Sequence, residues 1–261
     1  MRYFIACNED KKSKEVFLKI KNFLKDYDSF IFTEENPEIV ISIGGDGRFL
    51  KIIRKFLPII EQVGFVGIST GKLGYLCDYR SEEVDDFLHS FVSKTPFYDG
   101  RNLIKMKIEK DEDYFLNECR IEKIFRTLEI EVLINDEYFE NYSGNGLIFS
   151  SPTGSTAYCR SLNGPIINFH QNGFLMGEIA PIVNSVSNSL NSFLLLSDKD
   201  KVTLKGDFNM CSIGGDHFNF IVTKQKIEEI EISLSDKRVV LAHYKKFDFY
   251  EKLKNSFIKR S

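Results

Sequence analysis

The chain has 261 residues, a formal net charge of −3 and 43% hydrophobic residues. That supply of apolar side chains is enough for one large globular domain or two of ordinary size. Lysine and arginine are interleaved with acidic residues, so no basic stripe predicts a nucleic-acid partner. No apolar run approaches the roughly 20 residues of a membrane-spanning helix, and the chain does not open on a cleavable leader. We therefore expect a cytoplasmic protein without nucleic-acid or membrane partners.

Cysteine and histidine spacing predicts neither a disulfide framework nor a zinc site. The five cysteines are odd in number and form no C-x-x-C pair. The four histidines stand singly, without a second ligand at metal-binding spacing. We expect each to be structural or exposed, and we expect no metal held by a cluster of protein side chains.

The first part of the chain alternates strand-like and helix-like segments. Apolar strands are expected at 2–7, 39–43 and 63–68, with a shorter one at 29–33. Amphipathic helices are expected at 11–25, 48–57 and 81–92, the last capped by Ser81. This alternation predicts a parallel α/β sheet whose ligands lie at the carboxyl ends of the strands.

From about residue 99 the pattern changes to period two. Strands are expected at 103–108, 128–134, 138–142, 147–150, 201–205 and 227–234. A helix at 249–258 could close back onto the first domain. The predicted organisation is an α/β domain at 1–98, joined by 236–261, and a mostly β domain at 99–235.

One stretch, Gly44-Gly45-Asp46-Gly47, lies between the expected strand at 39–43 and the following helix. Glycines in such a turn allow positive φ and the close approach of an anion, and the helix start offers unpaired N–H groups. Asp46 would repel a phosphate, so it fits better as a base, a Mg²⁺ ligand or a hydroxyl acceptor. The alternative is a tight turn in which Asp46 only caps the helix.

A second stretch interrupts the β pattern at 151–158, Ser-Pro-Thr-Gly-Ser-Thr-Ala-Tyr. Its small hydroxyl residues could bond the ribose or purine edge of a nucleotide, and Tyr158 could stack on a base. Ser155 or Thr156 could cap a following helix at 157–162. A decorated turn with a core tyrosine explains this stretch equally well.

Four features in this order resemble the bacterial NAD kinase family over most of the chain: the glycine turn at 44–47, Gly71-x-x-Gly74, Asn117-Glu118 and the 151–158 run. The resemblance implies a Rossmann-like α/β domain followed by a β-sandwich domain that binds NAD. It implies transfer of a phosphoryl group from ATP or polyphosphate to the 2′-hydroxyl of the adenosine ribose of NAD, forming NADP. It also implies Mg²⁺ bound with the phosphate donor, and a homotetramer or dimer.

The resemblance also assigns roles to individual residues. Asp46 is implied as the catalytic acceptor of the 2′-hydroxyl proton. The implied phosphate-donor site comprises Gly44, Gly45, Gly47 and Arg48. The implied NAD-binding residues are Gly45, Asp46, Gly47, Gly74, Tyr75, Asn117, Glu118, Asn145, Thr156, Ala157, Tyr158 and Ser161. Asp216 and His217 are implied as further site contacts.

Two positions depart from the family pattern. Arg48 stands where the family usually has threonine, and its guanidinium could reach a phosphate of the donor. Asn145 stands where the family usually has aspartate, and it keeps the shape without the charge. Two other functions stay open: a lipid kinase, which shares the glycine motif, and a nucleotide sensor without activity.

Overall fold

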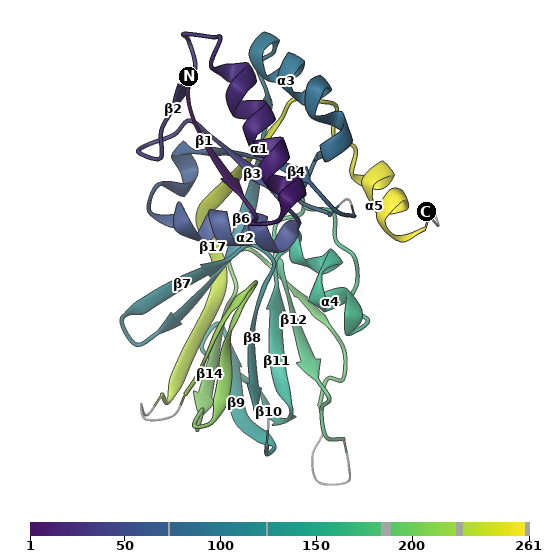
Figure 1. Cartoon of the computed structure of the whole chain (residues 1–261). Coiled ribbons are helices and arrows are strands. Elements are labelled where there is room, and N and C mark those ends of the chain that lie inside the picture. Colours follow the sequence, from purple (N-terminus) through teal and green to yellow (C-terminus); the bar gives the residue numbers. More distant parts are fainter. Residues whose placement is uncertain (73, 124, 184–188, 223–226, 259–261) are drawn as a thin grey trace. The chain divides into compact units, whose positions relative to one another are not determined.

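The computed structural model describes residues 1–72, 74–123, 125–183, 189–222 and 227–258, apart from the side chains of 219–221 (Figure 1). The chain divides into two compact units. The α/β unit comprises Met1–Gly100 and Arg238–Ser261, and the β unit comprises Arg101–Lys237. Strands β6 (Phe97–Ile108) and β17 (Glu229–His243) each contribute residues to both units.

The α/β unit is built on a parallel sheet. Its elements are β1 (Arg2–Cys7), α1 (Lys11–Leu24), β2 (Ile31–Phe32), β3 (Ile39–Ile43), α2 (Asp46–Lys55), the 3-10 helix η1 (Leu57–Gln62), β4 (Gly64–Ser69), β5 (Tyr79–Arg80), the 3-10 helix η2 (Ser81–Glu83), α3 (Val84–Ser93) and α5 (Phe249–Phe257). The strand order is β17-β4-β3-β1-β2, and β5 pairs with β4. Every one of these pairs is parallel.

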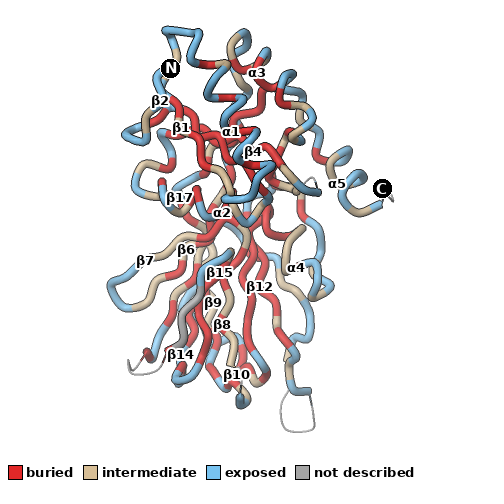
Figure 2. Tube along the Cα trace, viewed as in Figure 1, coloured by how far each residue is buried: buried red, intermediate tan, exposed pale blue. Residues whose placement is uncertain are grey.

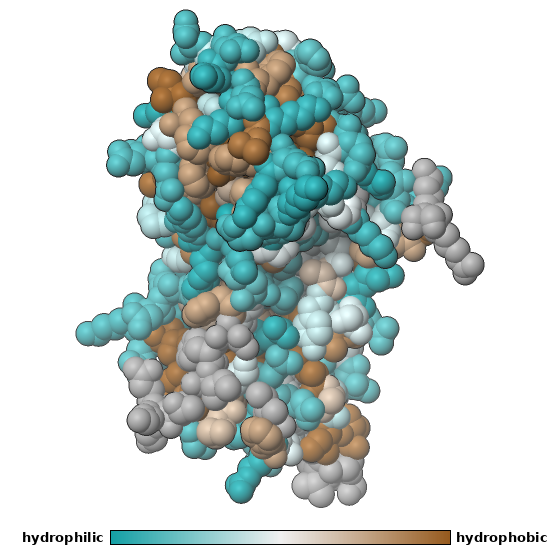
Figure 3. Space-filling model, viewed as in Figure 1, coloured by the Kyte–Doolittle hydropathy of each residue, from teal (hydrophilic) through white to brown (hydrophobic). Residues whose placement is uncertain are grey.

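Burial explains why the central strands of this sheet are apolar throughout. All residues of β3 and β4 are buried (Figure 2). Parallel strands covered on both faces lose the polar alternation of half-exposed strands. Helix α1 covers the sheet with one stripe, since Val16, Ile20 and Leu24 recur at helical spacing and are buried. Hydrophilic side chains cover most of the visible face of this unit (Figure 3).

Two details of the expected helices were wrong. Helix α2 begins at Asp46, two residues before the expected start at Arg48. Ser81 does not cap the third helix, because this segment is a 3-10 turn followed by α3. The Glu83 carboxylate closes that turn by accepting the N–H of Arg80 at 2.8 Å.

The β unit consists of antiparallel strands in two sheets. Its elements, besides parts of β6 and β17, are β7 (Asp111–Phe115), β8 (Glu118–Lys123), β9 (Leu128–Ile134), β10 (Glu137–Gly144), β11 (Gly146–Ser150), η3 (Gly154–Thr156), α4 (Tyr158–Ser161), β12 (Phe174–Ile179), β13 (Leu194–Leu196), β14 (Lys201–Gly206), β15 (Cys211–Gly215) and β16 (Phe218–Ile221). One sheet has the order β10-β9-β14-β17, and β6 pairs with β7. The other has the order β13-β12-β11-β8-β15-β16.

Side chains from both sheets form the core of the β unit. Leu128 and Val132 of β9 belong to one buried cluster with Ile121 of β8 and Phe149 of β11. The predicted fold class, an α/β domain, a β domain and a C-terminal helix that belongs to the first unit, is confirmed. Among the described residues, no helix is long and apolar enough to cross a bilayer.

A buried ionic cluster lies at the end of β17 in the α/β unit. His243 Nδ1 is 2.5 Å from Asp78 Oδ2, and Nε2 is 3.6 Å from Asp99 Oδ2. Burial alone would lower the pKa of His243, but the hydrogen bond to Asp78 and the nearby Asp99 carboxylate outweigh it and raise the pKa. Burial would raise the pKa of Asp78, yet its bonds to His243 and Lys252 bring the net shift below the ordinary value.

These opposite shifts predict a pH window in which the cluster stabilises the fold. The Asp78 contribution is present above its unfolded pKa of about 4 and is lost as the pH falls through its lower folded pKa. The His243 contribution is complete below its unfolded pKa of about 6.5 and is lost as the pH rises through its higher folded pKa. We predict that the melting-temperature advantage of wild type over His243→Gln is greatest at pH 5–6.5 and shrinks at higher pH. Thermal melts at several pH values test this, with exposed His89→Gln as control, and an advantage that grows with pH would contradict it.

Candidate active site

The glycine turn follows β3 at the carboxyl edge of the parallel sheet. Gly44 has φ +148°, a backbone conformation that side chains other than glycine rarely adopt. A Cβ there would also lie 2.8 Å from Nδ2 of Asn8 and 3.0 Å from Cβ of Arg48. Gly44 is therefore glycine because the fold itself requires it.

Gly45 and Gly47 are different, because none of the described residues occupies the space beside them. A Cβ at either position would meet no described atom within 4 Å, and both residues are exposed. Gly45 is the N-cap of α2, so the free N–H groups of the first helical turn lie beside this open space. The turn thus combines backbone donors with room for a bulky anion.

Asp46 is the first residue of α2, and its side chain does not cap the helix. Gly45 occupies the N-cap position and no side chain bonds the helix start. The Asp46 carboxylate instead accepts the N–H of Tyr75 at 2.7 Å and the N–H of Leu76 at 3.0 Å. The reading of Asp46 as a helix cap is therefore wrong.

Gly74 makes this arrangement possible. A Cβ at position 74 would lie 2.1 Å from Oδ1 of Asp46, so any other residue would displace the carboxylate. The two N–H bonds fix the orientation of the carboxylate. Two of its four lone-pair sites remain for another donor, such as a substrate hydroxyl.

Arg48 lies on α2, two residues after Asp46. Its side chain is half-buried, and Nε has no hydrogen-bond partner among the described residues. It interacts electrostatically with Cys7 and Glu9 at the end of β1. The structure therefore places an arginine with hydrogen-bonding capacity beside the glycine turn.

The β unit contains a second cluster, organised around Asn117 and Glu118. The Asp216 carboxylate accepts three successive backbone N–H groups, from Leu116 at 2.8 Å, Asn117 at 2.8 Å and Glu118 at 3.4 Å. Asp216 has φ +49° at the turn between β15 and β16. The predicted site residue Asp216 thus holds the segment that carries two others.

The 151–158 run supports the same segment from another side. Ser151 donates its hydroxyl to the carbonyl of Leu116 at 2.5 Å and its N–H to the carbonyl of Asn117 at 2.9 Å. A Cβ at Gly154 would lie 2.0 Å from the Asn117 carbonyl oxygen, and one at Gly215 would lie 1.8 Å from that of Glu118. Ser151 and Gly154 of this run, together with Gly215 of β15, are therefore needed for close packing around Asn117 and Glu118.

Glu118 is a buried carboxyl group in this cluster. Its side chain is 4% exposed and Oε2 has no hydrogen-bond partner among the described residues. Burial, followed by the negative charge of Asp216, raises the pKa of Glu118 to about 8. The group is therefore largely protonated at neutral pH and can donate a hydrogen bond as well as accept one.

Tyr158 lies under a cation that the sequence did not reveal. The guanidinium of Arg120 on β8 is 4.7 Å from the centre of the Tyr158 ring and 3.1 Å from a Glu122 carboxylate oxygen. Arg120 follows Glu118 by two residues, so both side chains point to the same face of the strand. If β8 had been predicted as a strand, the i, i+2 spacing from Glu118 would have indicated Arg120 as a site residue.

Other predicted residues lie in less distinctive surroundings. The hydroxyls of Thr156 and Ser161 donate to the carbonyls of Thr153 and Tyr158 at 3.1 and 2.7 Å. Ala157, and neither Ser155 nor Thr156, is the N-cap of α4. His217 is exposed beside Asp216. Leu73, inside the second glycine loop, lies outside the described residues.

Asn145 is not brought to this cluster within the β unit. It precedes β11, whereas Ser150 at the other end of β11 leads into the 151–158 run. Five residues of strand separate the two ends by roughly 16 Å. Asn145 is exposed, and its backbone bonds Lys123 and Ile179.

The raised pKa of Glu118 predicts that burial of this side chain lowers the free energy of unfolding by an amount that depends on pH. An acid with a raised folded pKa loses stability as the pH rises from its unfolded pKa of about 4.3 to its folded value. We predict that the melting temperature of Glu118→Gln exceeds that of wild type, and that this difference grows as the pH rises from 5 to 8. Exposed Glu129→Gln is the control. A difference that stays constant or falls over this range would show that Glu118 is ionised in the folded protein.

Comparisons with known proteins agree with this geometry. The ATP-NAD kinase N-terminal domain matches residues 4–95, and the ATP-NAD kinase C-terminal domain matches residues 116–251. The chain is 34% identical to the NAD kinase of Limosilactobacillus reuteri, over 99% of this chain and 98% of that one. It is 32% identical to NAD kinase 1 of Bacillus anthracis, over 99% of each chain.

Two solved structures share the fold. The crystal structure of yeast NADH kinase complexed with NADH has a TM-score of 0.84 and 15% identity, covering 100% of this chain and 89% of that one. The crystal structure of an NAD kinase from Archaeoglobus fulgidus in complex with ATP has a TM-score of 0.78 and 20% identity, covering 98% and 99% of the two chains. The two domain matches and the full-length relatives establish that this chain belongs to the ATP-NAD kinase family.

Proposed function

We propose that this chain is an NAD kinase in which Asp46 receives the proton of the acceptor hydroxyl. The reaction transfers a phosphoryl group from ATP, or from polyphosphate, to the 2′-hydroxyl of the adenosine ribose of NAD and forms NADP. Family membership supports the reaction. The observation that carries the role of Asp46 is its carboxylate, held by two N–H bonds beside two glycines that border open space.

Asp46 acts by position rather than by strong basicity. An ionised aspartate is a weak base, but in a loose transition state the proton leaves the attacking hydroxyl late. The N–H groups of Tyr75 and Leu76 fix the carboxylate and leave lone pairs for the 2′-hydroxyl. Catalysis in such a reaction comes mostly from alignment of the two reacting groups.

The donor phosphates are proposed to bind at Gly44, Gly45, Gly47 and Arg48. The space beside Gly45 and Gly47 admits phosphate oxygens to the backbone N–H groups of α2, and Arg48 can add a charged donor. Phosphate and carboxylate oxygens are ligands that fit Mg²⁺. The donor phosphates would be the main ligands of the ion, and Asp46 is the carboxylate that the glycine turn could contribute. Bound there, Mg²⁺ would neutralise charge on the transferred group.

For NAD binding we propose the Asn117–Glu118 cluster of the β unit and, from the family resemblance alone, Gly74, Tyr75 and Asp46 of the α/β unit. Protonated Glu118 can offer a hydrogen bond to a ribose hydroxyl or an adenine nitrogen. Thr156, Ala157 and Tyr158 are proposed to face the adenine. Because Arg120 lies over Tyr158, a stacked base must use the opposite face or displace the guanidinium.

The remaining expected contacts have weaker support. The Ser161 hydroxyl is already bonded to its own helix, and Asn145 lies a strand length away from Ser151. His217 stays a proposal because of its position beside Asp216. A cytoplasmic location and assembly into a homotetramer or dimer are likewise proposed from family membership alone.

The proposed catalytic role of Asp46 can be tested by substitution. Asp46→Ala should lower turnover by at least about 10²-fold, the low end of general acid–base contributions, while NAD binding is largely kept. Steady-state formation of NADP and calorimetry with NAD measure the two effects. Exposed Asp28→Ala is the control. Turnover of the Asp46→Ala variant at the wild-type rate would remove the proposed catalytic role.

Substitution of Gly47 separates the stability of the glycine turn from its function. Gly47→Ala should keep or raise the melting temperature, because alanine is favoured over glycine in a helix by up to about 1 kcal/mol. It should nevertheless lower NADP formation by at least about 10-fold, since the methyl group enters the space proposed for phosphate. Asn22→Ala, on the exposed side of α1, should gain helix propensity without loss of activity. A fully active Gly47→Ala enzyme would show that this space is not used.

A further inference from the structure

We infer that Lys252 of α5 is a positioning residue for Asp46, acting through the segment Tyr75–Asp78. This inference rests on the proposed function, because it concerns the orientation of the proposed catalytic carboxylate. Lys252 does not belong to the residues proposed to touch NAD or the phosphate donor.

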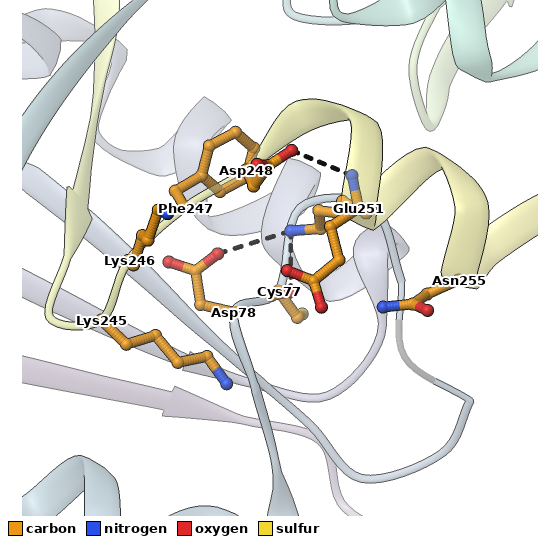
Figure 4. A pocket seen from close by; sticks show the side chains of 9 residues that line it. Cys77, Asp78, Lys245, Lys246, Phe247, Asp248, Glu251 and Asn255 are labelled. Carbon is orange, nitrogen blue, oxygen red and sulfur yellow. Dashed lines mark hydrogen bonds and ion pairs between the residues drawn. The ribbon is translucent and has the colours of Figure 1, made fainter.

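Lys252 makes its contacts from a nearly buried position. Its Nζ donates to the carbonyl of Cys77 at 2.9 Å and lies 3.4 Å from Oδ1 of Asp78 (Figure 4). The side chains of Lys252 and Asp78 are 10% and 9% exposed. A buried ion pair with an added hydrogen bond constrains geometry more than an exposed pair, which solvent screens.

The same short segment carries the donors that hold Asp46. The N–H groups of Tyr75 and Leu76 bond its carboxylate, and the next residue, Cys77, is the one whose carbonyl Lys252 fixes. Cys77 Sγ also contacts the carbonyl of Gly44 at 3.6 Å. The segment therefore links α5 on one side to the glycine turn on the other.

Helix α5 contacts both ends of this segment. The rings of Phe257 and Tyr75 stack with their centres 6.1 Å apart. At the other end, His243 bonds the second oxygen of Asp78 at 2.5 Å. The Asp248 carboxylate starts the helix by accepting the N–H of Glu251 at 3.0 Å. A shift of α5 would consequently move the two donors on Asp46.

A cavity beside Lys252 indicates which replacement can preserve this role. Its volume is about 280 Å³, and Lys252 is one of its lining residues. Figure 4 labels other lining residues, among them Asp78, Lys246, Glu251 and Asn255. Arginine is larger than lysine but keeps the charge and the donors. The cavity offers room for the guanidinium, so Lys252→Arg should retain both contacts.

The first experiment compares turnover with substrate affinity. Lys252→Met should lower kcat for NADP formation by about 10-fold, because a small displacement of a catalytic group is costly, while KM for NAD changes less than about 2-fold. Lys252→Arg should restore most of kcat, and Lys254→Met, at an exposed position of the same helix, should match wild type. Calorimetric NAD-binding stoichiometry gives the folded fraction, and Lys252→Gln replaces the Met variant if that one does not fold. An unchanged kcat in both neutral variants would overturn the inference.

The second experiment tests whether Lys252 acts through Asp46. In the Asp46→Asn background, Lys252→Met should reduce the residual kcat by less than about 2-fold, because coupled residues are not additive. A 10-fold loss in both backgrounds would mean that α5 only supports the fold, and would overturn the inference. Absence of NADP formation by wild type with ATP or polyphosphate would instead reject the proposed function.

Discussion

The proposed catalytic site depends on one pair of hydrogen bonds, from the N–H groups of Tyr75 and Leu76 to the Asp46 carboxylate. These bonds turn a carboxylate at a helix start away from the cap position and fix it beside an open glycine turn. A fixed charge of this kind costs no reorganisation when the reaction occurs. The need to hold this carboxylate explains two other features. Position 74 has no room for a Cβ, and Lys252 binds the carbonyl of Cys77, the residue after Leu76.

In the β unit, too, an aspartate carboxylate holds a backbone segment by accepting its N–H groups. Asp216 accepts three consecutive N–H groups and so sets the backbone that presents Asn117 and Glu118. In each unit a carboxylate bonds successive backbone N–H groups, next to a glycine that has no room for a Cβ. The two carboxylates differ in the number of N–H groups that they accept: Asp216 accepts three, whereas Asp46 accepts two.

The sequence predicted the features that depend on local patterns. The apolar run before three glycines predicted the strand β3 and the turn that follows it, and both are confirmed. The donors on Asp46 could not be predicted, because they are backbone groups about 30 residues away and any residue type can supply them. Strand β8 was missed because its buried and partly exposed positions do not alternate regularly, and Arg120 was missed with it. Asn145 is close to the 151–158 run in sequence, but an extended strand carries it far from that run in space.

The central claim is that the anchored carboxylate of Asp46 faces the acceptor hydroxyl of NAD. A crystal structure of the chain with NAD bound tests it most directly, through the distance between the Asp46 carboxylate and the 2′-hydroxyl of the adenosine ribose. We expect about 2.6–3.2 Å, a hydrogen-bond distance, with the bonds from Tyr75 and Leu76 retained. A 2′-hydroxyl bound beyond the reach of Asp46 and held by another acid or base would contradict it.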